Sequence, residues 1–119
     1  MKYQNLHVWQ ISFELCKQVY PKVNHINDYS FRDQIRRSCI SISSNIAEGM
    51  ERESNKETAY FLSIAKGSTG ELNTQLLLAA EFGYISLTDR DMLCEQCNRI
   101  AKILASLIRK FRTQQPLRA

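Results

Sequence analysis

Residues 38–49, SCISISSNIAEG, decide between two folds. Ile40 to Ser43 alternates apolar and polar side chains, which is typical of a half-buried strand. Over a longer interval, apolar residues recur at the spacing of one helical face: Phe31, Ile35, Cys39, Ile42 and Ile46. This helical stripe continues through the whole stretch, whereas the alternation fails at Ser44. We therefore predict a helix over 31–48.

The same periodicity predicts three further helices, at 6–22, 55–82 and 89–113. Ser54 and Glu57 form a capping box before the third helix of the chain, and Gly83 is suited to the left-handed conformation that ends it. By the same rules, Ser30 and Thr88 are expected to cap the second and fourth helices, and Gly49 to end the second.

Four amphipathic helices joined by short loops predict an all-α protein, an antiparallel up-down-up-down four-helix bundle. We expect one domain over 1–119, with a frayed C-terminal tail from about 114 to 119. In the last helix, the expected core positions follow a heptad pattern; they are Leu93, Cys97, Ile100, Leu104, Leu107 and Phe111.

The apolar face of the first helix is wider than one bundle core requires. A second seam beside the core-facing one contains Trp9 and Phe13, and Ile40 is expected on the outer face of the second helix. We therefore predict that Trp9, Phe13 and Ile40 contact another copy of the chain in a homo-oligomer.

Positive charge is concentrated near the C-terminus. Residues 96–119 carry six basic residues and no acidic one, whereas the rest of the chain has a net charge of −2. Basic side chains spread over one helix can bind the phosphates of RNA or DNA through counterion release, without reading the bases. The candidates are Arg99, Lys102, Arg109, Lys110 and Arg112.

Two arginines of the second helix are candidates for a structural ion pair. In an antiparallel hairpin, Arg32 and Arg36 face the region around Glu71, whose neighbours one heptad away are apolar. Because a partly buried carboxylate requires a cationic partner, we expect an ion pair between Glu71 and one of these arginines.

Catalytic and metal-binding patterns are not expected. Cys94 and Cys97 resemble half of a metal site, but no second ligand pair follows, and His7 and His25 have no companion one turn away. We expect no catalytic residue, no metal and no cofactor. Since the chain shows neither a signal peptide nor a membrane span, we expect a cytoplasmic protein with reduced thiols.

Four motifs occur in order along the chain: VWQ at 8–10, QIRRSCISISSNIAEG at 34–49, FLSIAKGSTGEL at 61–72 and GYI at 83–85. In these motifs the sequence resembles the bacterial four-helix-bundle proteins that are also called 23S rRNA intervening-sequence proteins. The resemblance implies an antiparallel four-helix bundle, assembly into pentameric rings, and no known enzymatic activity. A distant relative with the same bundle is the accessory protein of diversity-generating retroelements, a basic pentamer that binds nucleic acid and a reverse transcriptase.

Two functions remain open at this point. The first is a non-enzymatic oligomer, a pentamer by the resemblance, that binds RNA or DNA through its basic helix ends. The second is a structural scaffold or an adaptor for a protein partner, in which the positive charge only maintains solubility.

Overall fold

The computed structural model describes residues 2–114, and within that range the chain forms helices and no strands. A short 3-10 helix, η1 (Lys2–Asn5), is followed by four α-helices. These are α1 (His7–Val23), α2 (Tyr29–Met50), α3 (Asn55–Glu81) and α4 (Leu87–Gln114). The four predicted helices are confirmed, each boundary within two residues of its expected place. The expected frayed tail lies, from residue 115 on, outside the described residues.

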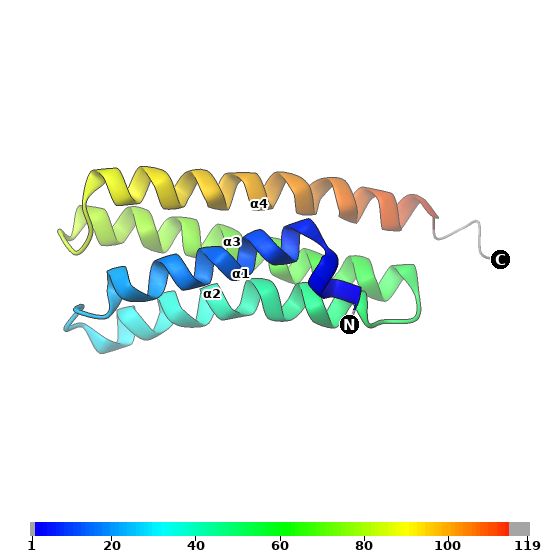
Figure 1. Cartoon of the computed structure of the whole chain (residues 1–119), viewed down its shortest axis with the longest axis horizontal. Helices are drawn as coiled ribbons and strands as arrows, with labels where there is room; N and C mark the ends of the chain where they lie inside the picture. Colours follow the sequence, from blue (N-terminus) through cyan, green and yellow to red (C-terminus); the bar gives the residue numbers. More distant parts are fainter. Residues whose placement is uncertain (1, 115–119) are drawn as a thin grey trace.

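The helices run alternately in opposite directions and form an elongated bundle of 53 × 22 × 21 Å (Figure 1). Each helix packs against its neighbours in the chain, and α1 also packs against α4. The helices therefore close a ring in chain order, with α1 diagonal to α3 and α2 diagonal to α4. This is the predicted antiparallel four-helix bundle.

Among the four α-helices α1 is the shortest, with 17 residues against 27 in α3 and 28 in α4. At the end of the bundle that carries the α2–α3 connection, α1 stops short of the other helices (Figure 1). The 3-10 helix η1 packs on both α1 and α2 there. No helix within residues 2–114 combines the length and the hydropathy that a membrane-spanning segment requires.

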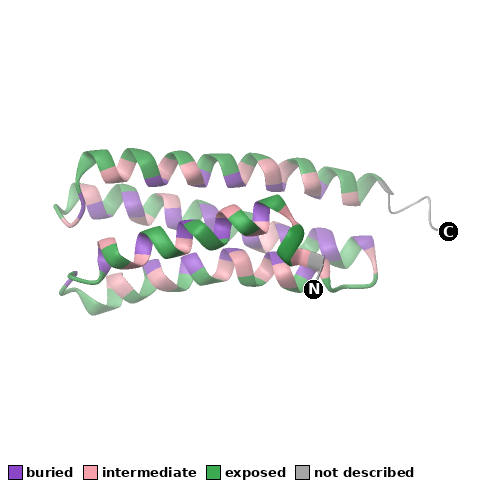
Figure 2. Cartoon of the chain, in the orientation of Figure 1, coloured by how far each residue is buried: buried purple, intermediate pink, exposed green. Residues whose placement is uncertain are grey.

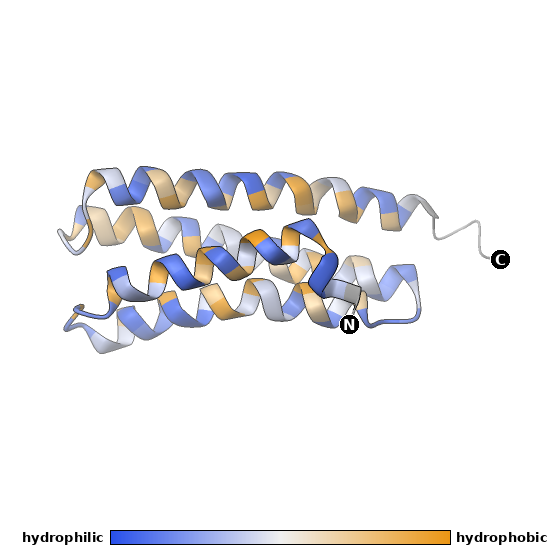
Figure 3. Cartoon of the chain, in the orientation of Figure 1, coloured by the Kyte–Doolittle hydropathy of each residue, from blue (hydrophilic) through white to orange (hydrophobic). Residues whose placement is uncertain are grey.

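The core is built from the helix sides that face one another (Figure 2). Hydrophobic and hydrophilic positions alternate along each helix, as amphipathic helices require (Figure 3). Ile35, Ile42 and Ile46 are fully buried, whereas Ile40 is about half exposed. The helical interpretation of the stretch at 38–49 is therefore confirmed, because a strand would have placed Ile40 and Ile42 on the same side.

The core positions of α4 depart from the expected heptad in its last turns. Leu93, Ile100 and Leu104 are buried as predicted, but the next buried residue is Ile108, and Leu107 is only partly buried. A straight helix with 3.6 residues per turn drifts away from a strict seven-residue repeat. The α4 core face therefore moves by one residue near its C-terminus.

Both predicted signals that bound α3 are confirmed. The backbone amide of Glu57 donates to the side-chain oxygen of Ser54 over 3.1 Å. Gly83 has a φ of +80°, and the amides of Gly83 and Tyr84 donate to the carbonyls of Ala80 and Ala79. This paired arrangement satisfies the last carbonyls of the helix.

The caps of α2 and α4 differ from the prediction. The amide of Phe31 donates to a carboxylate oxygen of Asp28, and the amide of Asp89 donates to the hydroxyl of Ser86. Asp28 and Ser86 are therefore the caps, instead of Ser30 and Thr88. Both helices begin two residues earlier than predicted because an equally good capping residue stands two positions upstream of each predicted cap.

Gly49 does not end α2, which continues to Met50. It is buried where α2 crosses α3, and a Cβ atom at this position would lie 3.0 Å from Cβ of Phe61 and 3.2 Å from the carbonyl oxygen of Thr58. The predicted C-terminal role is wrong: at this position the missing side chain lets the two helices approach closely.

Candidate nucleic-acid interface

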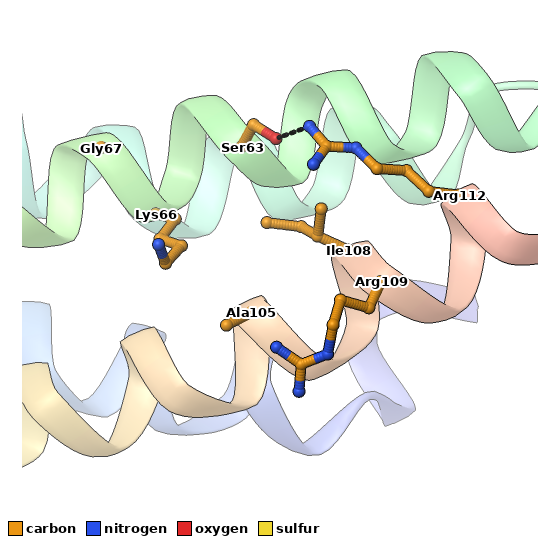
Figure 4. Close-up of a pocket in the computed structure, with 7 residues that line it drawn as sticks. All are labelled: Ser63, Lys66, Gly67, Ala105, Ile108, Arg109 and Arg112. Atoms are coloured by element: carbon orange, nitrogen blue, oxygen red, sulfur yellow. Dashed lines mark hydrogen bonds between the residues drawn. The ribbon is translucent and has the colours of Figure 1, made fainter.

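A cationic hollow of about 480 Å³ lies between α3 and α4 on the outer side of the bundle (Figure 4). Its lining consists of two small residues, one serine, one isoleucine and three cations: Ser63, Lys66, Gly67, Ala105, Ile108, Arg109 and Arg112. In Figure 4, Lys66 on α3 and Arg109 on α4 border the hollow, and Ile108 lies between the helices. A Cβ atom at Gly67 would meet no other atom within 4 Å, so the space beside this residue is open.

A second hollow of about 330 Å³ adjoins the first. It is lined by Lys56, Ala59, Tyr60, Ser63 and Arg112, and the last two residues line both hollows. We call the two hollows together the α3–α4 groove. Four cations line this groove, two from each helix, and no acidic side chain is among its lining residues.

Arg112 is held in place at the junction of the two hollows. Its guanidinium donates a hydrogen bond to the hydroxyl oxygen of Ser63 over 3.3 Å, as Figure 4 shows. The Ser63 hydroxyl in turn donates to the carbonyl oxygen of Ala59 over 2.9 Å. Because its proton is directed at this carbonyl, Ser63 presents a lone pair to Arg112 and orients the guanidinium across the groove.

The charges of the groove are not neutralised by ion pairs with the acidic residues that the structure describes. In residues 2–114, every ion pair uses a cation at or before Arg90; these cations are Lys17, Lys22, Arg32, Arg36, Arg52 and Arg90. Lys56 and Lys66 form no ion pair with a described acidic residue, and neither do the cations of α4 that follow Arg90. The groove therefore has its full positive charge available for an anion.

The five predicted nucleic-acid residues do not share one surface. Arg109 and Arg112 lie together in the α3–α4 groove. Arg99 lies on the α1 side of α4, with its guanidinium 3.1 Å from a ring nitrogen of His7. Lys102 and Lys110 are exposed on α4 and do not line the groove.

The sequence argument missed Lys56 and Lys66 because α3 carries both signs of charge and did not stand out as basic. A helical signal was present, since Lys56, Ser63 and Lys66 follow one another at steps of seven and three residues, along one helix face. Only the antiparallel packing of α3 on α4 shows that this face meets Arg109 and Arg112.

An apolar hollow of about 420 Å³ lies between α1 and α2. We call it the α1–α2 apolar groove; its lining residues are Phe13, Cys16, Lys17, Tyr20, Ile40 and Ser43. Phe13 is 45% exposed and Ile40 49% exposed, and the ring of Trp9 stacks on Phe13 at 5.1 Å. The three residues predicted to contact another copy thus lie beside one another, and their role in assembly stays a prediction.

The two grooves lie on opposite sides of the molecule. The helices form a closed ring in chain order, so the outer side of the α1–α2 pair faces away from the outer side of the α3–α4 pair. The apolar groove therefore lies on one side of the bundle and the cationic groove on the other.

The expected ion pair with Glu71 does not form in this chain. Glu71 is exposed, and Arg32 and Arg36 both lie near Asp33, with N–O distances of 3.4 and 3.8 Å. Arg36 also donates to the side-chain oxygen of Asn24 over 2.6 Å. The prediction is wrong because Asp33, on the same turn of α2, and Asn24, at the C-terminal end of α1, contact the arginines in place of Glu71.

The cysteines at described positions are free thiols. The Cys39 thiol donates a hydrogen bond that lowers the pKa of Cys16, although partial burial acts in the opposite direction. Burial raises the pKa of Cys97 to about 12 and also raises that of Cys94.

Among residues 2–114, no three His, Cys, Asp or Glu side chains are arranged so that they could hold a metal ion.

Comparison with known proteins agrees with this fold. The family model described as 23S rRNA-intervening sequence protein matches residues 4–106. A crystal structure of a protein with unknown function, from the S23 ribosomal protein family of Bacteroides thetaiotaomicron, is similar over 85% of this chain and 97% of that chain, with 28% identity and a TM-score of 0.79. A search of curated proteins found no match. With a four-helix bundle and a family match over most of its length, the chain belongs to the family of 23S rRNA-intervening sequence proteins.

Proposed function

We propose that this protein is a non-enzymatic homo-oligomer that binds the phosphate backbone of RNA or DNA in its α3–α4 groove. The observation that carries the proposal is the uncompensated charge of that groove. Lys56, Lys66, Arg109 and Arg112 converge there without an acidic neighbour in the lining. Such a cluster favours a polyanion, because binding releases the counterions condensed on the nucleic acid.

Self-association is supported by the α1–α2 apolar groove. Phe13 and Ile40 leave a contiguous apolar surface in water, which a second copy of the chain would cover. Because this surface lies opposite the α3–α4 groove, association through it would leave the cations accessible. A ring would then present one groove per copy, and several weak phosphate sites on one assembly bind a long polyanion more tightly than a single site does. The resemblance to the family suggests five copies.

The lining of the groove supports binding without catalysis. Its polar groups are four cations and Ser63, whose proton is donated to a backbone carbonyl. No histidine or carboxylate lines the groove to act as a general base. The free thiols fit the reducing conditions of the cytoplasm.

Salt titration tests the nucleic-acid proposal. Binding of a labelled oligonucleotide, measured by fluorescence anisotropy, should weaken steeply as the NaCl concentration rises. Arg109→Gln and Arg112→Gln should each weaken binding. Each should also make the plot of log association constant against log salt concentration less steep by about 0.7 to 0.9, the contribution of one phosphate contact. Arg37→Gln is the matched control, since Arg37 is also exposed and forms no ion pair with a described acidic residue, but lies on α2.

Two results would contradict this part of the proposal. Equal losses in the Arg109→Gln and Arg37→Gln variants would show that net charge matters and the groove does not. Absence of binding at about 50 mM salt would exclude a phosphate site altogether.

Sedimentation velocity tests self-association. The wild-type protein should sediment as an oligomer, and Ile40→Asn should shift it toward the monomer. Leu77→Asn is the matched control, because Leu77 is 46% exposed, close to the value for Ile40, but lies on α3. A wild-type protein that stays monomeric at high concentration would refute the role of the α1–α2 apolar groove.

The scaffold function is the second candidate, and one observation favours it. Leu78 and Phe82 are exposed at the end of α3, and the Phe82 ring lies edge-on to Phe31 and Tyr84 at 5.7 and 6.3 Å. This apolar cluster is separate from both grooves and could receive a protein partner. An oligomer that binds no nucleic acid at low salt would support the scaffold over the phosphate-binding protein.

A further inference from the structure

We infer that the α3–α4 groove binds a single strand of nucleic acid and that one base of this strand stacks on Tyr60. This inference rests on the nucleic-acid binding proposed above. The ligand class is then an unpaired segment of RNA or DNA, with its phosphates against the four cations. Duplex nucleic acid is excluded from the groove by its shape.

The shape of the site is the first argument. Lys66 on α3 and Arg109 on α4 border a hollow that Ala105 and Ile108 also line, and Arg112 of α4 reaches across it to Ser63 of α3. Adjacent helices pack with axes about 8–10 Å apart, so the channel between them is too narrow for a double helix. Proteins that read a duplex instead insert a convex element, such as a single helix, into the major groove.

The second argument is the aromatic ring inside the channel. Tyr60 lines the same hollow as Lys56 and Arg112, and it is 62% exposed. An edge-on contact with Phe61, at 5.3 Å between ring centres, supports the Tyr60 ring on one side. A positively charged groove with an exposed aromatic ring is the arrangement that binds single strands without sequence preference, since every base has a face that can stack.

The length of the groove fits a short segment. Lys56 and Lys66 are ten residues apart on α3, which corresponds to about 15 Å along the helix. At about 3.4 Å per nucleotide of a stacked strand, this distance spans about four nucleotides. Several phosphates and one stacked base can therefore be bound together.

Three probes with equal numbers of phosphates separate base stacking from charge. They are an oligothymidylate of about 16 nucleotides, an oligomer of abasic residues, and a hairpin duplex. The wild-type protein should bind oligothymidylate at least about fivefold more tightly than either other probe, the gain expected from one stacked base. Tyr60→Ala should abolish the preference over the abasic oligomer, whereas Tyr60→Phe, which keeps the ring, should retain it.

Tyr29→Ala is the matched control for the loss of an exposed tyrosine. Tyr29 is 63% exposed but lies at the start of α2, outside the groove, so its removal should leave the preference unchanged. Tighter binding of the duplex, or an unchanged preference in Tyr60→Ala, would overturn the inference. If the inference about single strands fails in this way, a loss of affinity in Arg109→Gln would still support phosphate binding in the groove. Equal affinities of Arg109→Gln and wild type for all three probes would refute the single-strand inference and the proposed nucleic-acid function together.

Discussion

The side-chain hydroxyl of Thr58 in α3 donates a hydrogen bond to the carbonyl oxygen of Gly49 in α2 over 2.8 Å. The two helices meet here so closely that a Cβ atom at position 49 would press on Cβ of Phe61. Gly49→Ala should therefore lower the free energy of unfolding by about 1–3 kcal/mol, the usual cost of overpacking. Urea denaturation followed by circular dichroism measures this change.

Gly67→Ala is the control for that substitution. Gly67 also lies inside a helix, but its Cβ would project into open space. The alanine should stabilise the protein by up to about 1 kcal/mol, because alanine is the better helix former. Similar effects of the two substitutions would contradict the close approach of α2 and α3 at Gly49.

A polar cluster between α2 and α3 gives the second prediction. The hydroxyls of Ser41 and Ser68 are 2.8 Å apart, and the side-chain amide of Asn45 donates to Ser41 over 2.9 Å. Ser41→Ala removes the hydroxyl that both partners contact, and Ser68 is buried. We expect a loss of about 1–3 kcal/mol in chemical denaturation, the cost of leaving the buried Ser68 hydroxyl unpaired. Ser44→Ala, at an exposed position on the same helix, should leave stability nearly unchanged.

The start of α2 gives the third prediction. Because Asp28 accepts the hydrogen bond from the Phe31 amide, Asp28→Ala should cost about 1 kcal/mol of unfolding free energy, whereas Asp28→Asn should keep the cap. Ser30→Ala should have almost no effect, since Ser30 lies inside the helix and is exposed. Thermal denaturation of the three variants distinguishes the two capping positions, and a larger loss in Ser30→Ala would reverse the assignment.

Cysteine reactivity gives the fourth prediction. The thiolate is the reactive form, so a lowered pKa increases the reactive fraction at neutral pH and a raised pKa decreases it. Cys16, whose pKa is lowered by Cys39, should react with iodoacetamide well before Cys97, whose pKa is raised to about 12. Alkylation of Cys16 should accelerate as the pH rises toward the pKa of this thiol and level off above it. Because that pKa is lowered, the rate should level off at a lower pH than for an ordinary thiol. Peptide mass spectrometry identifies the modified residue.

Substitution of the donor tests the cause of this reactivity. In Cys39→Ala the hydrogen bond to Cys16 is lost, so the pKa of Cys16 should rise and its alkylation at neutral pH should slow. If the rate does not change, the reactivity of Cys16 comes from its exposure alone.

The sequence predicted the helices because their signals are local. The stripe of apolar residues from Phe31 to Ile46 outweighs the short alternation of apolar and polar residues around Ile40. The cap at Ser54 and the left-handed conformation of Gly83 each depend on residues within one helical turn. Where two local signals competed, as with Asp28 and Ser30, the sequence alone did not decide which residue caps the helix.

Contacts between helices were not predictable in the same way. The sequence indicated that Glu71 requires a cationic partner and pointed to Arg32 or Arg36, but the side chains that Arg36 meets are those of Asn24 and Asp33. The α3–α4 groove likewise combines Arg112, which the sequence pointed to, with Tyr60, which it did not. Helix rotation and crossing position determine these pairs, and neither quantity is encoded in a local pattern.

The sequence by itself determined four amphipathic helices, an excess of apolar surface on the first two and an excess of positive charge on the last, because each depends only on residue type and helical spacing. The tertiary structure alone decided that α3 supplies half of the cations of the groove and that the apolar and cationic surfaces lie on opposite sides. Residues far apart in the chain become neighbours only when the antiparallel helices pack, and packing is decided by how the whole core fills space.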